Sequence, residues 1–109
     1  MTSLLNELEK HLTVRITNVV VKDDHIEFFL DDRRIISFPL DWSPRLWHGT
    51  PAERNRWELI GRGIGVHWPE LDEDISLAGV LLGLHSGESE RSLQRWLKRR
   101  KDKAGSLPV

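Results

Sequence analysis

The chain has 109 residues, 39% of them hydrophobic and 30% charged, which is enough for one compact domain with a modest core. It contains no cysteine, so disulfides, thiolate catalysis, zinc knuckles and iron–sulfur clusters are excluded. No basic leader precedes an apolar run, and no apolar stretch approaches the roughly 20 residues that cross a bilayer, so we expect a cytoplasmic protein without a membrane partner.

The net charge of −1 conceals an uneven distribution. Residues 1–90 contain 9 Lys and Arg against 16 Asp and Glu, whereas residues 91–109 contain 7 against 1. An acidic body with a basic tail is typical of a chain with an interaction segment. The alternative is a solvated helix whose cations compensate the charge of the body.

The chain begins with a predicted helix. Leucines recur at helical spacing between Leu4 and Leu12, which predicts a short amphipathic helix over residues 3–11. A helix of this length is not stable alone in water. We therefore treat residues 1–13 as an N-terminal helical extension.

Three apolar runs follow, at residues 14–21, 26–30 and 35–38. Short polar turns separate them, and each turn contains an Asp-Asp pair. Connections of two to four residues cannot make the crossover that parallel strands require, so the runs predict a three-strand antiparallel meander. Pro39 ends the third strand because it lacks a backbone donor.

The clearest local signal in the chain is a helix start. Thr50 can accept a hydrogen bond from the backbone of Glu53, the Glu53 side chain can return one, and Pro51 suits the first helical position. This central capped helix is predicted to run to about Ile60 and to stop at Gly61.

Two further elements are expected before the C-terminal part of the chain. Alternating glycines predict a turn into a short fourth strand, residues 64–68, which Pro69 closes. Three acids at residues 72–74 precede an apolar segment, residues 75–82. This segment predicts a short buried helix, because acids suit the positive end of a helix dipole.

A basic C-terminal helix is predicted over residues 88–101. Acids stand at its front and cations at its rear, and Leu93, Trp96 and Leu97 form a narrow apolar stripe for docking on the body. Residues 103–109 contain Gly, Ser and Pro and predict a frayed tail. The expected fold class is α+β, with one small antiparallel sheet.

The acidic segment is the main concentration of potential metal ligands. Carboxylates could meet a hard cation, but the spacing matches no calcium loop, so no metal is predicted and a cation-dependent enzyme is only a third hypothesis. We favour a structural role in which some acids cap a helix and others pair with arginines. The acidic segment comprises His67, Glu70, Asp72, Glu73 and Asp74. The available arginines are Arg45, Arg54, Arg56 and Arg62.

The remaining motifs supply no recognisable catalytic group. The glycine array at residues 61–65 follows a helix and precedes a strand, the reverse of the order in phosphate-binding loops. His85 and Ser86 lack the spacing of a nucleophile elbow, so Ser86 is better explained as a turn or capping residue. We predict a protein that is not an enzyme and needs no cofactor.

Five tryptophans and no tyrosine occur in the chain. A small core needs large side chains, so two or three of the tryptophans are expected in the interior. Trp42 and Trp47 flank the turn at residues 43–46, and we expect one or both to be partly exposed at a partner surface.

The basic helix offers an alternative surface. Seven cations between Arg91 and Lys103 are enough for non-specific contact with nucleic-acid phosphates if they align. No second helix of helix-turn-helix spacing accompanies them, which disfavours sequence-specific DNA reading. The candidate contacts are Arg91, Arg95, Lys98, Arg99, Arg100 and Lys101.

A set of motifs in the central block is specific enough to indicate a family. The motifs are Pro39–Leu46, Thr50–Glu58 and the string GIGVHWPELDEDIS from Gly63 to Ser76, followed by Gly79 to Gly83. Over roughly residues 14–83 the chain resembles the bacterial family known only as domain of unknown function 2442.

The resemblance implies a small α+β domain with an antiparallel sheet and no established catalytic residues. It also implies frequent genomic pairing with another small uncharacterised protein, in an arrangement similar to toxin and antitoxin. The implied organisation is an extension at 1–13, a family core domain at 14–83, and a basic helix with a frayed tail at 84–109.

We therefore expect a non-enzymatic, antitoxin-like interaction module that binds a small protein partner through an acidic loop and a Trp-rich turn. The expected partner contacts are Trp42, Arg45, Trp47, His67, Glu70, Asp72 and Glu73. The alternative is a nucleic-acid-associated regulator that uses the basic C-terminal helix.

Overall fold

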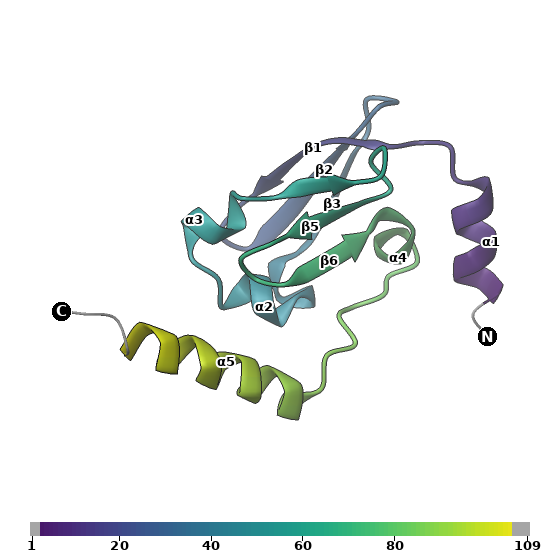
Figure 1. Ribbon diagram of the computed structural model, residues 1–109. Helices are drawn as coiled ribbons and strands as arrows, with labels where there is room; N and C mark the ends of the chain where they lie inside the picture. Colours follow the sequence, from purple (N-terminus) through teal and green to yellow (C-terminus); the bar gives the residue numbers. More distant parts are fainter. Residues whose placement is uncertain (1–2, 106–109) are drawn as a thin grey trace.

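The computed structural model describes residues 3–105 and contains two small sheets with helices beside them (Figure 1). The strands are β1 (Ile16–Val21), β2 (His25–Leu30), β3 (Ile35–Pro39), β4 (Glu58–Ile60), β5 (Gly65–Trp68) and β6 (Glu73–Ser76). The helices are α1 (Ser3–His11), the 3-10 helix η1 (Leu40–Trp42), α2 (Pro44–Trp47), α3 (Pro51–Arg54), α4 (Leu77–Leu81) and α5 (Glu90–Gly105). The predicted α+β class is confirmed. In the described part of the chain, no helix combines the length and apolarity needed to cross a membrane.

The first sheet consists of β1, β2 and β3 in that order, and its strands are antiparallel. Alternation along β2 determines its buried face, because Ile26, Phe28 and Leu30 point into the core. Phe28 and Phe38, on neighbouring strands, meet edge to face with ring centroids 5.0 Å apart. This face of the sheet forms one wall of the core.

The predicted short strand at residues 64–68 is present as β5, but the prediction that it belongs to a single sheet is wrong. β5 pairs with β4 on one side and with β6 on the other, in a second three-stranded antiparallel sheet. The local pattern predicts a helix over residues 58–60, but Leu59 pairs with Val66 across a hairpin. Strand pairing of this kind is a tertiary interaction that overrides helix propensity.

The central helix has its capping box but is much shorter than predicted. Glu53 N donates to Thr50 Oγ1 at 3.1 Å, and Thr50 N donates to Glu53 Oε1 at 2.8 Å. The helix nevertheless ends at Arg54. The indole of Trp68 donates to the Arg54 carbonyl at 2.9 Å and so occupies the acceptor that the amide of Glu58 would use in a longer helix.

A glycine turn joins β4 to β5 and also joins the two sheets. Gly61 and Gly63 have positive φ angles of 57° and 101°. Ile16 N donates to Gly63 O at 2.8 Å, and a Cβ on Gly63 would lie 2.2 Å from Ile16 O. Glycine is therefore required where the second sheet meets the start of β1.

The short buried helix begins later than predicted. Ile75 and Ser76 belong to β6, and Ser76 Oγ caps α4 by accepting a bond from Gly79 N at 2.9 Å. The acids at residues 72–74 therefore do not lie in the first helical turn. Ile75 pairs with Val66 in the second sheet, and this pairing places it in a strand although the acids before it are typical of a helix start.

Two helices lie outside the sheets, near different ends of the molecule (Figure 1). α1 contacts the body mainly at α4. α5 docks through Leu93 and Trp96, which are buried, and through Leu97 at the margin, as predicted. Residues 103–105 continue the helix and are not frayed, whereas residues 106–109 of the predicted tail lie outside the described residues.

Candidate functional site

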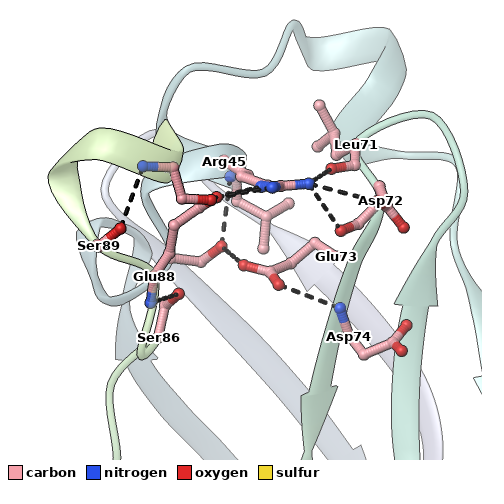
Figure 2. Close-up of polar contacts among 11 residues, drawn as sticks. Arg45, Leu71, Asp72, Glu73, Asp74, Ser86, Glu88 and Ser89 are labelled. Atoms are coloured by element: carbon pink, nitrogen blue, oxygen red, sulfur yellow. Dashed lines mark hydrogen bonds and ion pairs between the residues drawn. The ribbon is translucent and has the colours of Figure 1, made fainter. Parts of the chain in front are cut away.

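The two segments predicted to bind a partner are bonded to each other. Ser43 is the buried cap of α2, and its hydroxyl donates to Glu73 Oε2 at 2.5 Å. Arg45 Nη1 donates to the backbone carbonyl of Asp72 at 3.2 Å (Figure 2). The two segments therefore form one surface, which we call the joined turns and define as residues 42–49 and 69–74.

Arg45 is the central group of this region. Its Nε lies 2.9 Å from Glu88 Oε1 and its Nη2 lies 2.6 Å from Glu88 Oε2, in a bidentate pair whose side chains are 13% and 9% exposed. The Arg45 guanidinium, with a smaller contribution from a Ser92 hydrogen bond, holds the pKa of Glu88 below its ordinary value. Because such bonds are directional, they fix α2 to the segment that enters α5.

A second ion pair holds α5 further along its length. Arg100 Nη1 and Nη2 lie 2.9 and 2.8 Å from the two carboxylate oxygens of Glu53. This bond is the largest cause that lowers the pKa of Glu53 to about 2. The guanidinium carbons of Arg45 and Arg100 lie 5.1 and 4.7 Å from the ring centroid of Trp96. Arg100, one of the predicted nucleic-acid contacts, is thus engaged within the chain.

Neither of these long-range pairs follows from local sequence patterns. The partners are 43 residues apart for Arg45 and Glu88 and 47 apart for Glu53 and Arg100. Glu53 is fully explained by its capping box, and Glu88 by its place ahead of a helix, so neither acid signals a second role. Only the docking of α5 brings the partners together.

Most of the predicted acidic contacts are occupied within the chain. Glu70 pairs with Arg56. His67 Nδ1 lies 2.5 Å from Asp74 Oδ1, and this bond raises the pKa of His67. Burial raises the pKa of the Glu73 carboxyl despite its hydrogen bonds. The acidic segment is therefore largely a set of structural contacts.

The predicted bracing by arginine is confirmed at two of the four positions. Arg45 and Arg56 pair with carboxylates of the acidic segment. Arg54 instead donates to two backbone carbonyls of α2, each at 2.8 Å. Arg62 is exposed and makes no ion pair with another described residue.

Trp47 and Asp72 are the most exposed of the predicted contacts on the joined turns. The Trp47 residue is 50% exposed and the Asp72 side chain 88% exposed, whereas Trp42 packs partly against the core. A Cβ on Gly49 would lie 2.9 Å from the Leu71 side chain. The loop after Trp47 therefore packs directly on the turn that carries Asp72.

The outward face of α5 carries exposed cations. Arg91, Arg95 and Lys98 are spaced by four and three residues, so they share a stripe on the side opposite the docked residues. Arg99 and Lys101 flank this stripe. All five are exposed, and none of their side chains makes an ion pair or hydrogen bond with another residue in 3–105.

The remaining candidates for chemistry have structural contacts of their own. Across residues 3–105, no group of three or more His, Asp or Glu side chains is placed to hold a metal ion. Ser86 Oγ accepts a bond from Glu88 N at 3.3 Å, as expected of a turn residue. His85 stacks on Trp42 with ring centroids 4.2 Å apart.

Comparison with known proteins gives a family and a fold. A family model described as "Protein of unknown function (DUF2442)" matches residues 16–86, so the chain belongs to this family, as its central motifs indicated. No curated protein matches the chain.

Two solved structures are similar to this one. The crystal structure of a protein of unknown function from Rhodospirillum rubrum is 22% identical, with a TM-score of 0.61 over 73% of this chain and 96% of that chain. The solution structure of an uncharacterised protein from Chromobacterium violaceum is 25% identical, with a TM-score of 0.62 over 86% of this chain and 85% of that chain. Both likenesses concern the fold.

Proposed function

We propose that this member of the DUF2442 family is a non-enzymatic interaction module that binds a small protein partner through the joined turns. The supporting observation is that two segments far apart in sequence form one surface on which Trp47 is half exposed. A large aromatic side chain on a well-supported surface is typical of an interface hot spot.

The backbone around Trp47 is held in place before any partner arrives. Arg54 donates to the Trp47 carbonyl. Ser43 bonds the start of α2 to Glu73 of β6, and Arg45 bonds α2 to the β5–β6 turn. A preorganised surface loses less entropy on binding. The exposed Asp72 carboxylate and the acidic body favour a basic partner.

The partner to test first is the product of the neighbouring gene, because the family resemblance implies an antitoxin-like pairing. Calorimetric titration of the two purified proteins measures the dissociation constant. Trp47→Ala is expected to weaken binding by about 2 kcal/mol, which is more than tenfold. Trp47 is half exposed, so its removal should leave the circular dichroism spectrum unchanged.

Ile64→Ala is the matched control, because Ile64 is 51% exposed but lies in the β4–β5 turn. Its dissociation constant should stay within about twofold of the wild-type value. Absence of a complex contradicts the proposed function. Equal binding by both variants contradicts the assignment to the joined turns.

A second candidate function is contact with nucleic acid through the outward face of α5. The five exposed cations of this face favour it. The ion pairs of Arg45 and Arg100 hold the helix so that this face stays outward. Such binding would be driven by release of counterions from phosphates. It would therefore weaken steeply as salt is raised.

Fluorescence anisotropy with a labelled duplex at several salt concentrations tests this candidate. The slope of log affinity against log salt is negative. The double variant Arg95→Ala, Lys98→Ala should reduce its magnitude by about 2. Lys22→Ala with Arg62→Ala removes the same charge from exposed positions on the body and should leave the slope unchanged. Binding that does not depend on salt contradicts the candidate.

A further inference from the structure

A cleft of about 260 Å³ opens beside the joined turns. One wall is β6, which pairs only with β5 in the described part of the sheet, so its outer edge is open to the cleft. Trp42 and Ser43 form a second wall, residues 84–87 form a third, and Leu5 of α1 contributes at the side. The cleft is separate from the exposed face of Trp47, which does not line it.

The charged groups of the cleft are acidic. Among its 14 described lining residues, Glu73 and Asp74 carry carboxylates and none is Lys or Arg. Asp74 contacts His67 through Oδ1 and its side chain is 66% exposed, whereas Glu73 is less exposed and lies against Ser43 at the second wall, so we place the ligand at Glu73.

Glu73 retains capacity to bind a cation. Its Oε2 accepts a bond from Ser43 Oγ, and its Oε1 accepts one from Asp74 N at 3.2 Å (Figure 2). Each carboxylate oxygen has two lone pairs, so each can accept another hydrogen bond. A ligand with several donors on one charged atom would match this arrangement.

The rest of the lining is mostly apolar and aromatic. Phe38, Val80 and Leu84 supply hydrocarbon surface. Trp42 stacks on His85 with an interplanar angle of 25°, so the two rings form an aromatic wall of the cleft. The cleft therefore combines a carboxylate, an aromatic wall and an apolar lining.

The geometry points to a binding site for a primary ammonium group carried on a short alkyl chain. The ammonium donates to the free lone pairs of Glu73 beside Trp42, and the alkyl chain lies against Phe38, Val80 and Leu84. The volume admits one such chain and is smaller than that of sites for drug-sized ligands. A free alkylamine and a lysine side chain share this chemistry.

Titration with butylamine, followed by nitrogen-15 NMR, tests the site. The wild type should show saturable shifts of the Trp42 indole N–H and of the amides at residues 84–87. Glu73→Gln should weaken binding about tenfold or more, because it removes a charge-assisted bond. Gln keeps an acceptor for Ser43, so the fold is retained.

Matched controls separate the site from general charge effects. Glu58→Gln removes the same charge from an exposed position outside the cleft and should leave the dissociation constant within about twofold. Leu84→Arg places a competing cation at the cleft and should weaken binding, whereas Leu82→Arg, outside the lining, should not.

Three results would overturn the site: no saturable shift with butylamine, equal shifts with butyrate, or undiminished binding by Glu73→Gln. Comparison of butylamine with N-acetyl-lysinamide identifies the source, and tighter binding of either one supports the site. The cleft shares Trp42, Ser43, Glu73 and Asp74 with the joined turns, but Trp47 does not line it, so Trp47→Ala should lose partner binding and keep amine binding.

Discussion

The two terminal helices attach to the body in very different ways. α5 buries Trp96 beneath two guanidinium groups, and ion pairs to the body stand near its start and within its second half. The side-chain contacts of Glu7 in α1 are to Lys10 and His11, so they lie within the helix itself. At the start of α1, Leu4 is 73% exposed.

The difference shows what turns an amphipathic helix into part of a core. Both helices have leucines at helical spacing, so the sequence pattern predicts each of them equally well. Ion pairs to distant elements are found only at α5 and the segment that enters it, among the described residues. They join Glu88 to Arg45 of α2 and Arg100 to Glu53 of α3. A buried aromatic side chain and the ion pairs around it support one another, because the aromatic ring limits the access of water.

Among the variants that test this difference, Trp96→Ala should cause the largest change in the free energy of unfolding. Truncation of a buried tryptophan is expected to lower the free energy of unfolding by about 3–5 kcal/mol, because it leaves a cavity and removes the surface on which both guanidinium groups lie. Urea unfolding measures the change. Leu4→Ala in α1 should change the same quantity by less than about 0.5 kcal/mol. Similar losses in both variants would show that the helices are attached alike.

Glu88→Gln should have the next largest effect. It leaves the Arg45 guanidinium without its bidentate partner at a site of low exposure, so we expect a loss of about 2 kcal/mol in urea unfolding. Glu7→Gln breaks the exposed pairs of α1 and should cost less than about 0.5 kcal/mol. A negligible loss in Glu88→Gln would mean that Arg45 is held by its carbonyl contacts alone.

Acid should weaken the Glu53 ion pair by a smaller amount. The folded pKa of Glu53 is about 2, below its ordinary value of 4.5, so its contribution is fully present above pH 4.5 and is lost as pH falls toward 2. With allowance for solvent screening, this loss is about 1–2 kcal/mol.

The measurement is the free energy of unfolding of wild type and Glu53→Gln across this pH range. Glu53→Gln should lack that part of the acid-dependent loss. Glu73 acts in the opposite direction, because its pKa is raised and its protonation favours the folded state as pH falls. The difference between the two proteins isolates Glu53. Parallel pH curves would contradict a specific role for its ion pair.

Much of the architecture follows from local signals. The Asp-Asp turns and alternating residues predict the three strands of the first sheet, and the Thr50 and Glu53 pair predicts the helix start where the structure has it. The helix end is different, because residues 58–60 pair with β5 and the indole of Trp68 donates to the Arg54 carbonyl. No pattern near Arg54 contains that information.

The candidate site was likewise predicted only in part from local sequence. Local composition identified the Trp-rich turn, the acidic segment and the arginines that could brace it, and the pairs of Arg45 and Arg56 are present. It did not identify Glu88 as the main partner of Arg45, nor the cleft at Glu73. Both depend on the path of the segment after α4, whose Ser86 N donates to Trp42 O at 2.9 Å.

The sequence by itself determined the strand runs, the cap at Thr50, the basic amphipathic helix and the family, because each is encoded by residues within a few positions of one another or by a continuous motif. Tertiary structure alone decided that β4, β5 and β6 form a separate sheet and that α3 stops after one turn. It also decided that ion pairs at Glu88, just before α5, and at Arg100, within it, hold α5 on the body. A strand edge, a free carbonyl or a carboxylate has several competing partners, and the path of the distant chain determines which of them it bonds.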